Sequence, residues 1–263
     1  MFGFFSARKK AESIIRALPV ADITGAKAGP TLLVTAGLDG DEYAGIEAAY
    51  AAAEKYSDGN FSGRLIILPL VNMPGFEAGV SHNPLDKKFP KYCIPGRAHG
   101  SPTERLMYYI VQTCARSAVL WLDLHSGARD EITTSCLWND ITGVPEVDAR
   151  GELFTQHSGA LAAVREHAGR RSKALAAYDC AYVLAESEDA TQHMRYIERA
   201  MQQLGMLAGQ PPTETIRIFT KTRDMYTLAE EIKTGEVLLW HKTAPSARKG
   251  ERAGEIAYDE LKG

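Results

Sequence analysis

Acidic residues and a histidine follow three apolar segments of the chain, in a pattern that could bind a metal ion. TLLVTAG is followed closely by Asp39 and Glu42, and AVLWLDL is followed by His125. Two carboxylates this close in the chain repel each other unless a cation holds them. A histidine from another strand end would complete a catalytic site with three protein ligands and a fourth position open to water. A third apolar segment, AYVLA, is followed by Glu186 and Glu188.

A structural explanation of the first acidic pair stays open at this point. Asp39 or Asp41 could be the N-cap of a helix, and Glu42 could be a favourable negative charge in its first turn. An Asp-x-x-Glu spacing alone does not separate a helix start from a pair of metal ligands.

The apolar and polar segments alternate in a way that is typical of an α/β protein. Short apolar runs predict buried strands at 31–37, 64–71, 118–124 and 181–187. Helical spacing predicts helices at 8–17, 42–56, 103–116, 158–168 and 190–208. Ser101 and Glu104 match a capping box at the start of one of them. This alternation predicts a sheet with helices on both faces, and ligands bind such sheets at the carboxyl ends of strands.

Two regions depart from this alternation. Residues 73–102 are rich in Pro, Gly, His and Asn, and a loop of this length in a compact domain is usually functional. After Gln210-Pro211-Pro212 the segments TIRIFTK and EVLLWHK suggest a small β-rich piece. We therefore expect a main α/β domain at 1–210 and a small β-rich C-terminal subdomain at 211–263.

Composition excludes several classes of protein. The 263 residues include 30 Lys and Arg against 33 Asp and Glu, and this near balance lacks the basic excess of a nucleic-acid-binding protein. Apolar runs are far shorter than the ~20 residues that span a bilayer. MFGFFSARKK places aromatic residues before basic ones, unlike a secretory signal, so we expect a cytoplasmic protein. The four cysteines show no CxxC pairing and are expected to be free thiols.

A series of segments resembles the succinylglutamate desuccinylase/aspartoacylase family of the zinc carboxypeptidase superfamily. In chain order, the segments are GPTLLVTAGLDGDEYAGIEAA, GRLIILPLVNMPGF, LDKKFP, GSPTERL, WLDLHSG, AESED and LGML. They extend over roughly residues 29–208. The resemblance implies a mixed, mostly parallel sheet flanked by helices. It also implies metal-dependent hydrolysis of an amide bond in a small N-acyl amino acid or peptide-like substrate.

The resemblance also implies a set of metal ligands. The first family motif is GHGDE-like and supplies a histidine and a glutamate, and the DLH block supplies a second histidine. The corresponding residues are Asp39, Glu42 and His125, so an aspartate stands where the family has its first histidine. We expect one Zn²⁺ per chain. Because an aspartate oxygen is a harder donor than an imidazole, Mn²⁺ or Co²⁺ could also serve.

The family's general base lies in a TVELG-like segment, and its position corresponds to Glu186, with Glu188 as the alternative. Such a base takes a proton from water and delivers it to the leaving amine. The family's substrate-binding Asn-Arg pair corresponds to Asp86 and Lys87 in LDKKFP. A lysine lacks the two-pronged guanidinium of arginine, so we expect weaker or differently shaped carboxylate binding there.

The family also uses an arginine upstream of this motif to stabilise the developing oxyanion. The sequence has no arginine between Phe76 and Lys87, which leaves His82 as the nearest cationic candidate. Arg97 is a further candidate for binding the substrate.

Two functions therefore stay open. The first is a metal-dependent deacylase of the carboxypeptidase type. The second is a catalytically inactive relative that binds a small ligand through the same cleft. Both predict a small-molecule or peptide-like partner, and the sequence leaves open whether the chain forms a homo-oligomer.

Overall fold

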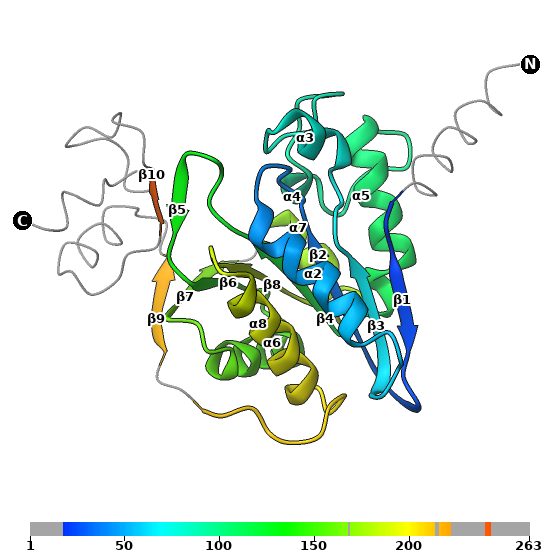
Figure 1. Cartoon of the computed structure of the whole chain (residues 1–263), viewed down its shortest axis with the longest axis vertical. Coiled ribbons are helices and arrows are strands. Elements are labelled where there is room, and N and C mark those ends of the chain that lie inside the picture. Colours follow the sequence, from blue (N-terminus) through cyan, green and yellow to red (C-terminus); the bar gives the residue numbers. More distant parts are fainter. Residues whose placement is uncertain (1–17, 168, 214–215, 222–239, 243–263) are drawn as a thin grey trace, which may run out of the picture.

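A mixed sheet forms the centre of the computed structural model, which describes residues 18–167, 169–213, 216–221 and 240–242. In that part of the chain its strands are β1 (Ala21–Thr24), β2 (Lys27–Ala36), β3 (Ser62–Leu68), β4 (Leu120–His125), β6 (Cys136–Ile141), β7 (Ala162–His167), β8 (Ala181–Glu186) and β9 (Arg217–Lys221). Their order in space is β1-β3-β2-β4-β8-β6-β7-β9 (Figure 1). The strands from β3 to β8 in that order are parallel, whereas β1 and β6 are antiparallel to their neighbours β3 and β8. The predicted mixed, mostly parallel sheet is confirmed.

Helices cover both faces of this sheet. On one face lie α2 (Tyr43–Lys55), α6 (Pro145–His157) and α8 (Ala190–Gln203), and on the other lie α5 (Pro102–Thr113) and α7 (Arg170–Ala176). Successive side chains of a strand point to opposite faces, so Leu32 and Val34 of β2 pack with α2 and α8 while Leu33 packs with α5. Burial on both faces explains why these strands are continuous apolar runs.

The segment 73–102 contains two short helices, α3 (Met73–Ala78) and α4 (Pro90–Cys93). The side chain of Asn72 caps α3 by accepting a hydrogen bond from Gly75 N at 3.1 Å, and its amide donates to the Leu38 carbonyl at 3.2 Å. A Cβ atom on Gly40 would lie 2.3 Å from the Gly75 backbone, so only glycine permits this contact. The segment therefore packs directly on the turn that follows β2.

The predicted helix at 158–168 is wrong, because Ala162–His167 is the strand β7. Alanine favours helices, which explains the prediction. In the structure β7 pairs with β6 on one side and β9 on the other, and Ala162, Ala163 and Val164 are buried. Pairing on both sides therefore outweighs local propensity at this position. The capping box of Ser101 and Glu104 at the start of α5 is confirmed.

The later part of the chain contributes a strand to the large sheet and a strand to a second sheet of two strands. β9 pairs with β7 in the large sheet, and β10 (Trp240–Lys242) pairs with β5 (Glu131–Thr133). The helix predicted at 8–17 and most of 211–263 lie outside the described residues, so the boundary at 210 stays a prediction. All four cysteines are free. None of the helices in the described ranges is long and apolar enough to cross a membrane.

Candidate active site

The predicted metal ligands meet at the carboxyl ends of neighbouring parallel strands. Asp39 and Glu42 lie in the turn between β2 and α2, and His125 is the last residue of β4. One ligand atom from each of these three residues lies within 4.8 Å of the other two. All three residues are buried, with Asp39 2% and His125 1% exposed. Glu186 ends the next strand, β8, directly opposite His125 in the pairing register.

Glu42 occupies the N-cap position of α2, but its side chain is used elsewhere. Its Oε2 atom lies 2.7 Å from Nδ1 of His125 and accepts a hydrogen bond from Ser126 N at 3.1 Å. Its extended backbone, with φ −106° and ψ 97°, directs the chain into the helix. Because Glu42 is the N-cap residue, neither Asp39 nor Asp41 holds that position. The helix-cap explanation of this acidic pair is therefore wrong.

Asp123 holds the other side of the histidine ring. Its Oδ2 atom lies 3.1 Å from Nε2 of His125 and accepts a hydrogen bond from Tyr182, while Oδ1 accepts one from Thr35 at 2.6 Å. Burial disfavours the imidazolium, but the carboxylates of Asp123 and Glu42 outweigh burial and raise the pKa of His125 well above its usual range. A carboxylate behind a metal-binding histidine orients the ring and increases its basicity.

Lys91 is a member of this site that the sequence reasoning missed. Its Nζ atom lies 2.5 Å from Oδ2 of Asp39, and its side chain is 17% exposed. Burial raises the pKa of Asp39 to about 6, although the Lys91 ammonium opposes this rise. Burial also disfavours the charge on Lys91, but Asp39 and Glu42 outweigh it and raise the pKa of Lys91. The sequence signal for it is its position directly after LDKKFP, one residue beyond Pro90.

A cavity of about 430 Å³ opens beside these residues. Glu42, Lys91, Ser126, Arg171 and Glu186 line it. The other lining residues are Tyr92, Glu131, Thr133, Trp138, Glu166 and Leu184. Within the described residues, Oε2 of Glu186 is a buried oxygen without a hydrogen-bond partner. Burial, followed by the charge of Glu42, raises the pKa of Glu186 to about 8.

Arg171, at the start of α7, is the second cationic side chain that the sequence reasoning missed. Its guanidinium lies 4.1 Å from the ring centroid of Tyr182 and donates a hydrogen bond to Asp140 Oδ2 at 3.1 Å. These contacts hold a positive charge in the cavity wall. No motif pointed to it, because α7 is only seven residues long and shows little periodicity.

Glu188 lies two residues beyond Glu186 and makes structural contacts. Its Oε1 atom accepts hydrogen bonds from Gly127 N at 2.7 Å and Thr133 N at 2.8 Å. These bonds fix the segment between β4 and β5. Glu186 lines the cavity and Glu188 does not.

The predicted substrate-binding pair also lies outside the cavity lining. Asp86 accepts hydrogen bonds from the backbone and hydroxyl of Thr103 at 2.9 and 2.7 Å, which tie it to the first turn of α5. Lys87 is exposed, with a positive φ of 56°. His82 packs against Phe89, with ring centroids 6.0 Å apart. None of these three residues lines the cavity that contains Glu186, and their roles in catalysis and substrate binding stay predictions.

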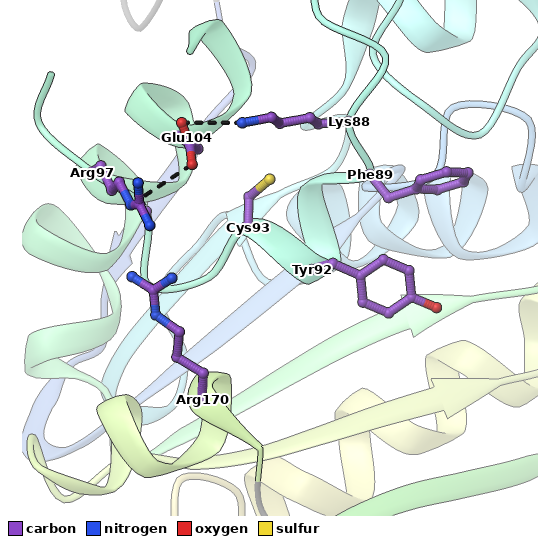
Figure 2. Close-up of a pocket in the computed structure, with 8 residues that line it drawn as sticks. Lys88, Phe89, Tyr92, Cys93, Arg97, Glu104 and Arg170 are labelled. Atoms are coloured by element: carbon purple, nitrogen blue, oxygen red, sulfur yellow. Dashed lines mark ion pairs between the residues drawn. The ribbon is translucent and has the colours of Figure 1, made fainter. Parts of the chain in front are cut away.

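Arg97 lines a different pocket of about 370 Å³ (Figure 2). Figure 2 shows Arg97 and Lys88 directed at Glu104, at 3.8 and 3.2 Å, with the Cys93 thiol nearby. Tyr92 lines both this pocket and the cavity that contains Glu186. Substrate binding by Arg97 stays a prediction, and the observed contacts of this arginine are with Glu104.

Comparison with known proteins identifies the family. A family model of the succinylglutamate desuccinylase/aspartoacylase catalytic domain matches residues 28–206. The chain belongs to this family. The matched range includes Asp39, Glu42, Lys91, His125 and Glu186. The resemblance found in the sequence segments is therefore confirmed.

Individual relatives agree with this assignment. N-α-acetyl-L-2,4-diaminobutyric acid deacetylase of Halomonas elongata is 38% identical over 101 residues, which is 38% of this chain and 30% of that enzyme. A succinylglutamate desuccinylase/aspartoacylase structure from Rhodobacter sphaeroides superposes with a TM-score of 0.71 at 22% identity, over 79% of this chain and 67% of the other. The product-bound ectoine utilization protein EutE of Ruegeria pomeroyi gives 0.70 at 24% identity, with the same coverage. These two structures support the fold.

Proposed function

We propose that this protein hydrolyses the amide bond of a small N-acylated amino acid, with a divalent metal ion held by Asp39, Glu42 and His125. The observation that carries the proposal is the position of these three side chains, whose donor atoms lie within 4.8 Å of one another beside a cavity lined by Glu186. Membership of a family whose named relatives include a deacetylase and desuccinylases supports the same reaction class.

The donor set suits a divalent ion. Two carboxylates and one imidazole are ligands that Zn²⁺ accepts, and the two oxygen donors also accommodate Mn²⁺ or Co²⁺. Among the described residues, Asp39 Oδ1 is buried without a hydrogen-bond partner, so one oxygen of this carboxylate is available to a cation. When bound, such an ion supplies Lewis-acid activation of water and of the substrate carbonyl.

The protein's own side chains would carry the remaining tasks. A carboxyl group with a pKa of about 8 accepts and returns a proton near neutral pH, which suits Glu186 as the base that transfers a proton to the leaving amine. Arg171 places a guanidinium in the cavity wall, where it can bind the carboxylate of an amino acid. Asp123 keeps Nδ1 of His125 directed at Glu42.

The test uses the full-length protein, stripped with a chelator and reloaded separately with Zn²⁺, Mn²⁺ or Co²⁺. Amine release is measured from N-acetyl and N-succinyl amino acids, with Nα-acetyl-L-2,4-diaminobutyrate among them. We expect release in the presence of an ion. Glu186→Gln should lower turnover about 10²- to 10⁴-fold without lowering metal content.

Glu188→Gln is the matched control, because a glutamine oxygen still accepts the bonds from Gly127 and Thr133. It should retain turnover. If Glu188→Gln loses turnover and Glu186→Gln keeps it, the base is Glu188.

A second candidate function is binding of a small ligand without catalysis. The ion pair between Lys91 and Asp39 favours it, because a lysine already neutralises one of the two carboxylates. Absence of stoichiometric metal after purification with Zn²⁺ or Mn²⁺ supplied, together with no amine release from any substrate in the panel, would support this second function.

A further inference from the structure

The carboxylate of Asp39 has two oxygens in different environments. Oδ2 receives the ammonium of Lys91 at 2.5 Å, whereas Oδ1 is buried and, within the described chain, has no hydrogen-bond partner. The Asp39 side chain is 3% exposed and that of Lys91 17%, so water screens this pair only weakly. Lys91 is thus the cation that compensates Asp39 in the metal-free protein.

A divalent ion and the ammonium of Lys91 would both bind the carboxylate of Asp39. Asp39, Glu42 and Glu186 are the acidic groups whose charges act on one another at this site. Resting on the function proposed above, we propose that Lys91 is an internal cation that competes with the metal ion for Asp39. The competition weakens metal binding, and in the metal-free protein Lys91 neutralises the negative charge of Asp39.

The position of Lys91 allows it to leave Asp39. It is the second residue of the four-residue helix α4, and its flexible side chain lines the same cavity as Glu42 and Glu186. The ring of Tyr92 lies 5.5 Å from Nζ while the ammonium is paired with Asp39, so this weak contact lies within its reach. The ammonium can therefore move into the cavity when an ion takes Asp39.

The first experiment measures metal affinity without substrate. Zn²⁺ and Mn²⁺ are titrated into metal-free Lys91→Met and wild-type protein in competition with a chromogenic chelator. We expect Lys91→Met to bind the ion at least about tenfold more tightly. A tenfold change in affinity corresponds to ~1.4 kcal/mol, and the repulsion between the ion and a unit positive charge a few ångströms away exceeds this energy.

Lys88→Met is the control for this titration. Lys88 lies three positions earlier and pairs with Glu104 at 3.2 Å, outside the cavity lining. Its removal should leave metal affinity within about twofold. Equal or weaker binding by Lys91→Met, or no binding by either protein, would overturn the proposal.

The second experiment uses the wild-type protein, so it does not depend on a variant that folds. Lysines are acetylated briefly with acetic anhydride, with and without saturating Zn²⁺, and labelling is quantified by mass spectrometry. We expect Zn²⁺ to increase labelling of Lys91 and to leave Lys88 unchanged. Unchanged or reduced labelling of Lys91 would contradict displacement. Neither experiment involves turnover, so a protein without deacylase activity could still pass both.

Discussion

The His125 side and the Asp39 side of the site are held in different ways. On the His125 side, Asp123 joins the histidine to Thr35 of β2 and Tyr182 of β8, and every member is almost fully buried. On the Asp39 side, the carboxylate has Lys91 as its hydrogen-bond partner and one oxygen without any, among the residues described. One side is fixed by the centre of the sheet, and the other depends on a short helix.

This difference assigns separate tasks to the two sides. A ligand locked by several buried hydrogen bonds loses little entropy when it binds a metal and keeps its geometry. A ligand whose partner is a lysine that can leave it, as proposed above, can change its charge environment. We infer that the His125 side sets the geometry of the site and that the Asp39 side tunes its affinity.

The largest expected effect comes from removing the histidine. His125→Ala deletes the one nitrogen donor of the candidate ligand set and leaves two carboxylates with too little coordination. Metal content, measured by atomic spectroscopy after dialysis, should fall well below one ion per chain. His99→Ala, at an exposed histidine of the loop before α5, is the control and should keep full content. Unchanged content in His125→Ala would place the metal elsewhere.

The next effect tests how firmly the His125 side is held. In Asp123→Asn the amide nitrogen faces a hydrogen-bond donor whichever way it is turned, because both carboxylate oxygens accept bonds. The free energy of unfolding should fall by about 3–5 kcal/mol, as for a broken buried charge pair. Urea unfolding of the metal-free protein measures it. A loss below about 1 kcal/mol would show that this network does not hold the site.

A smaller effect is expected from one bond of that network. Tyr182→Phe removes the hydroxyl that donates to Asp123 and keeps the ring that packs beside Arg171. A hydrogen bond to a charged group contributes about 1.5–3 kcal/mol, and we expect a loss in that range. The same urea experiment checks it, and the loss should be smaller than in Asp123→Asn.

The smallest stability effect is expected on the other side of the site. Asp39→Asn removes a carboxylate whose burial raises its pKa to about 6, so relief of this burial cost offsets the lost ion pair with Lys91, which keeps its interaction with the charge of Glu42. We expect the unfolding free energy of the metal-free protein to change by about 1 kcal/mol or less. If Asp39→Asn and Asp123→Asn lose equal stability, the contrast between the two sides is wrong.

Residues at the carboxyl ends of the central strands, or in the turns directly after them, were predictable from the sequence. Asp39, Glu42, His125 and Glu186 each follow or end an apolar run, and parallel strands bring such ends to one edge. Lys91 was not predictable in this way, because no periodic pattern fixes where a four-residue helix directs its side chain.

Contacts between parts of the chain that are separated in sequence also determine the positions of other charged residues and of one strand, so local sequence does not predict them. Arg171 reaches the cavity through its contacts with Tyr182 and Asp140, which belong to distant parts of the chain. Asp86 accepts a hydrogen bond from Thr103, and Arg97 forms an ion pair with Glu104. The spacing of these residues in the sequence did not indicate either contact. The alanine-rich segment of β7 has the local pattern of a helix, and its pairing with β6 and β9 depends on the topology of the sheet, which local sequence does not show.

The antiparallel pairing of β6 with β8 places the start of one strand beside the end of the other. Cys136, at the start of β6, lies opposite Glu186 in the register. The segment that leads into β6, including Glu131 and Thr133, therefore forms part of the cavity wall although it supplies none of the candidate ligands. Under the proposed function, we expect substitutions there to change which substrate fits without moving the candidate ligands or Glu186. The shape of the cavity and the candidate ligand set can thus change independently during evolution.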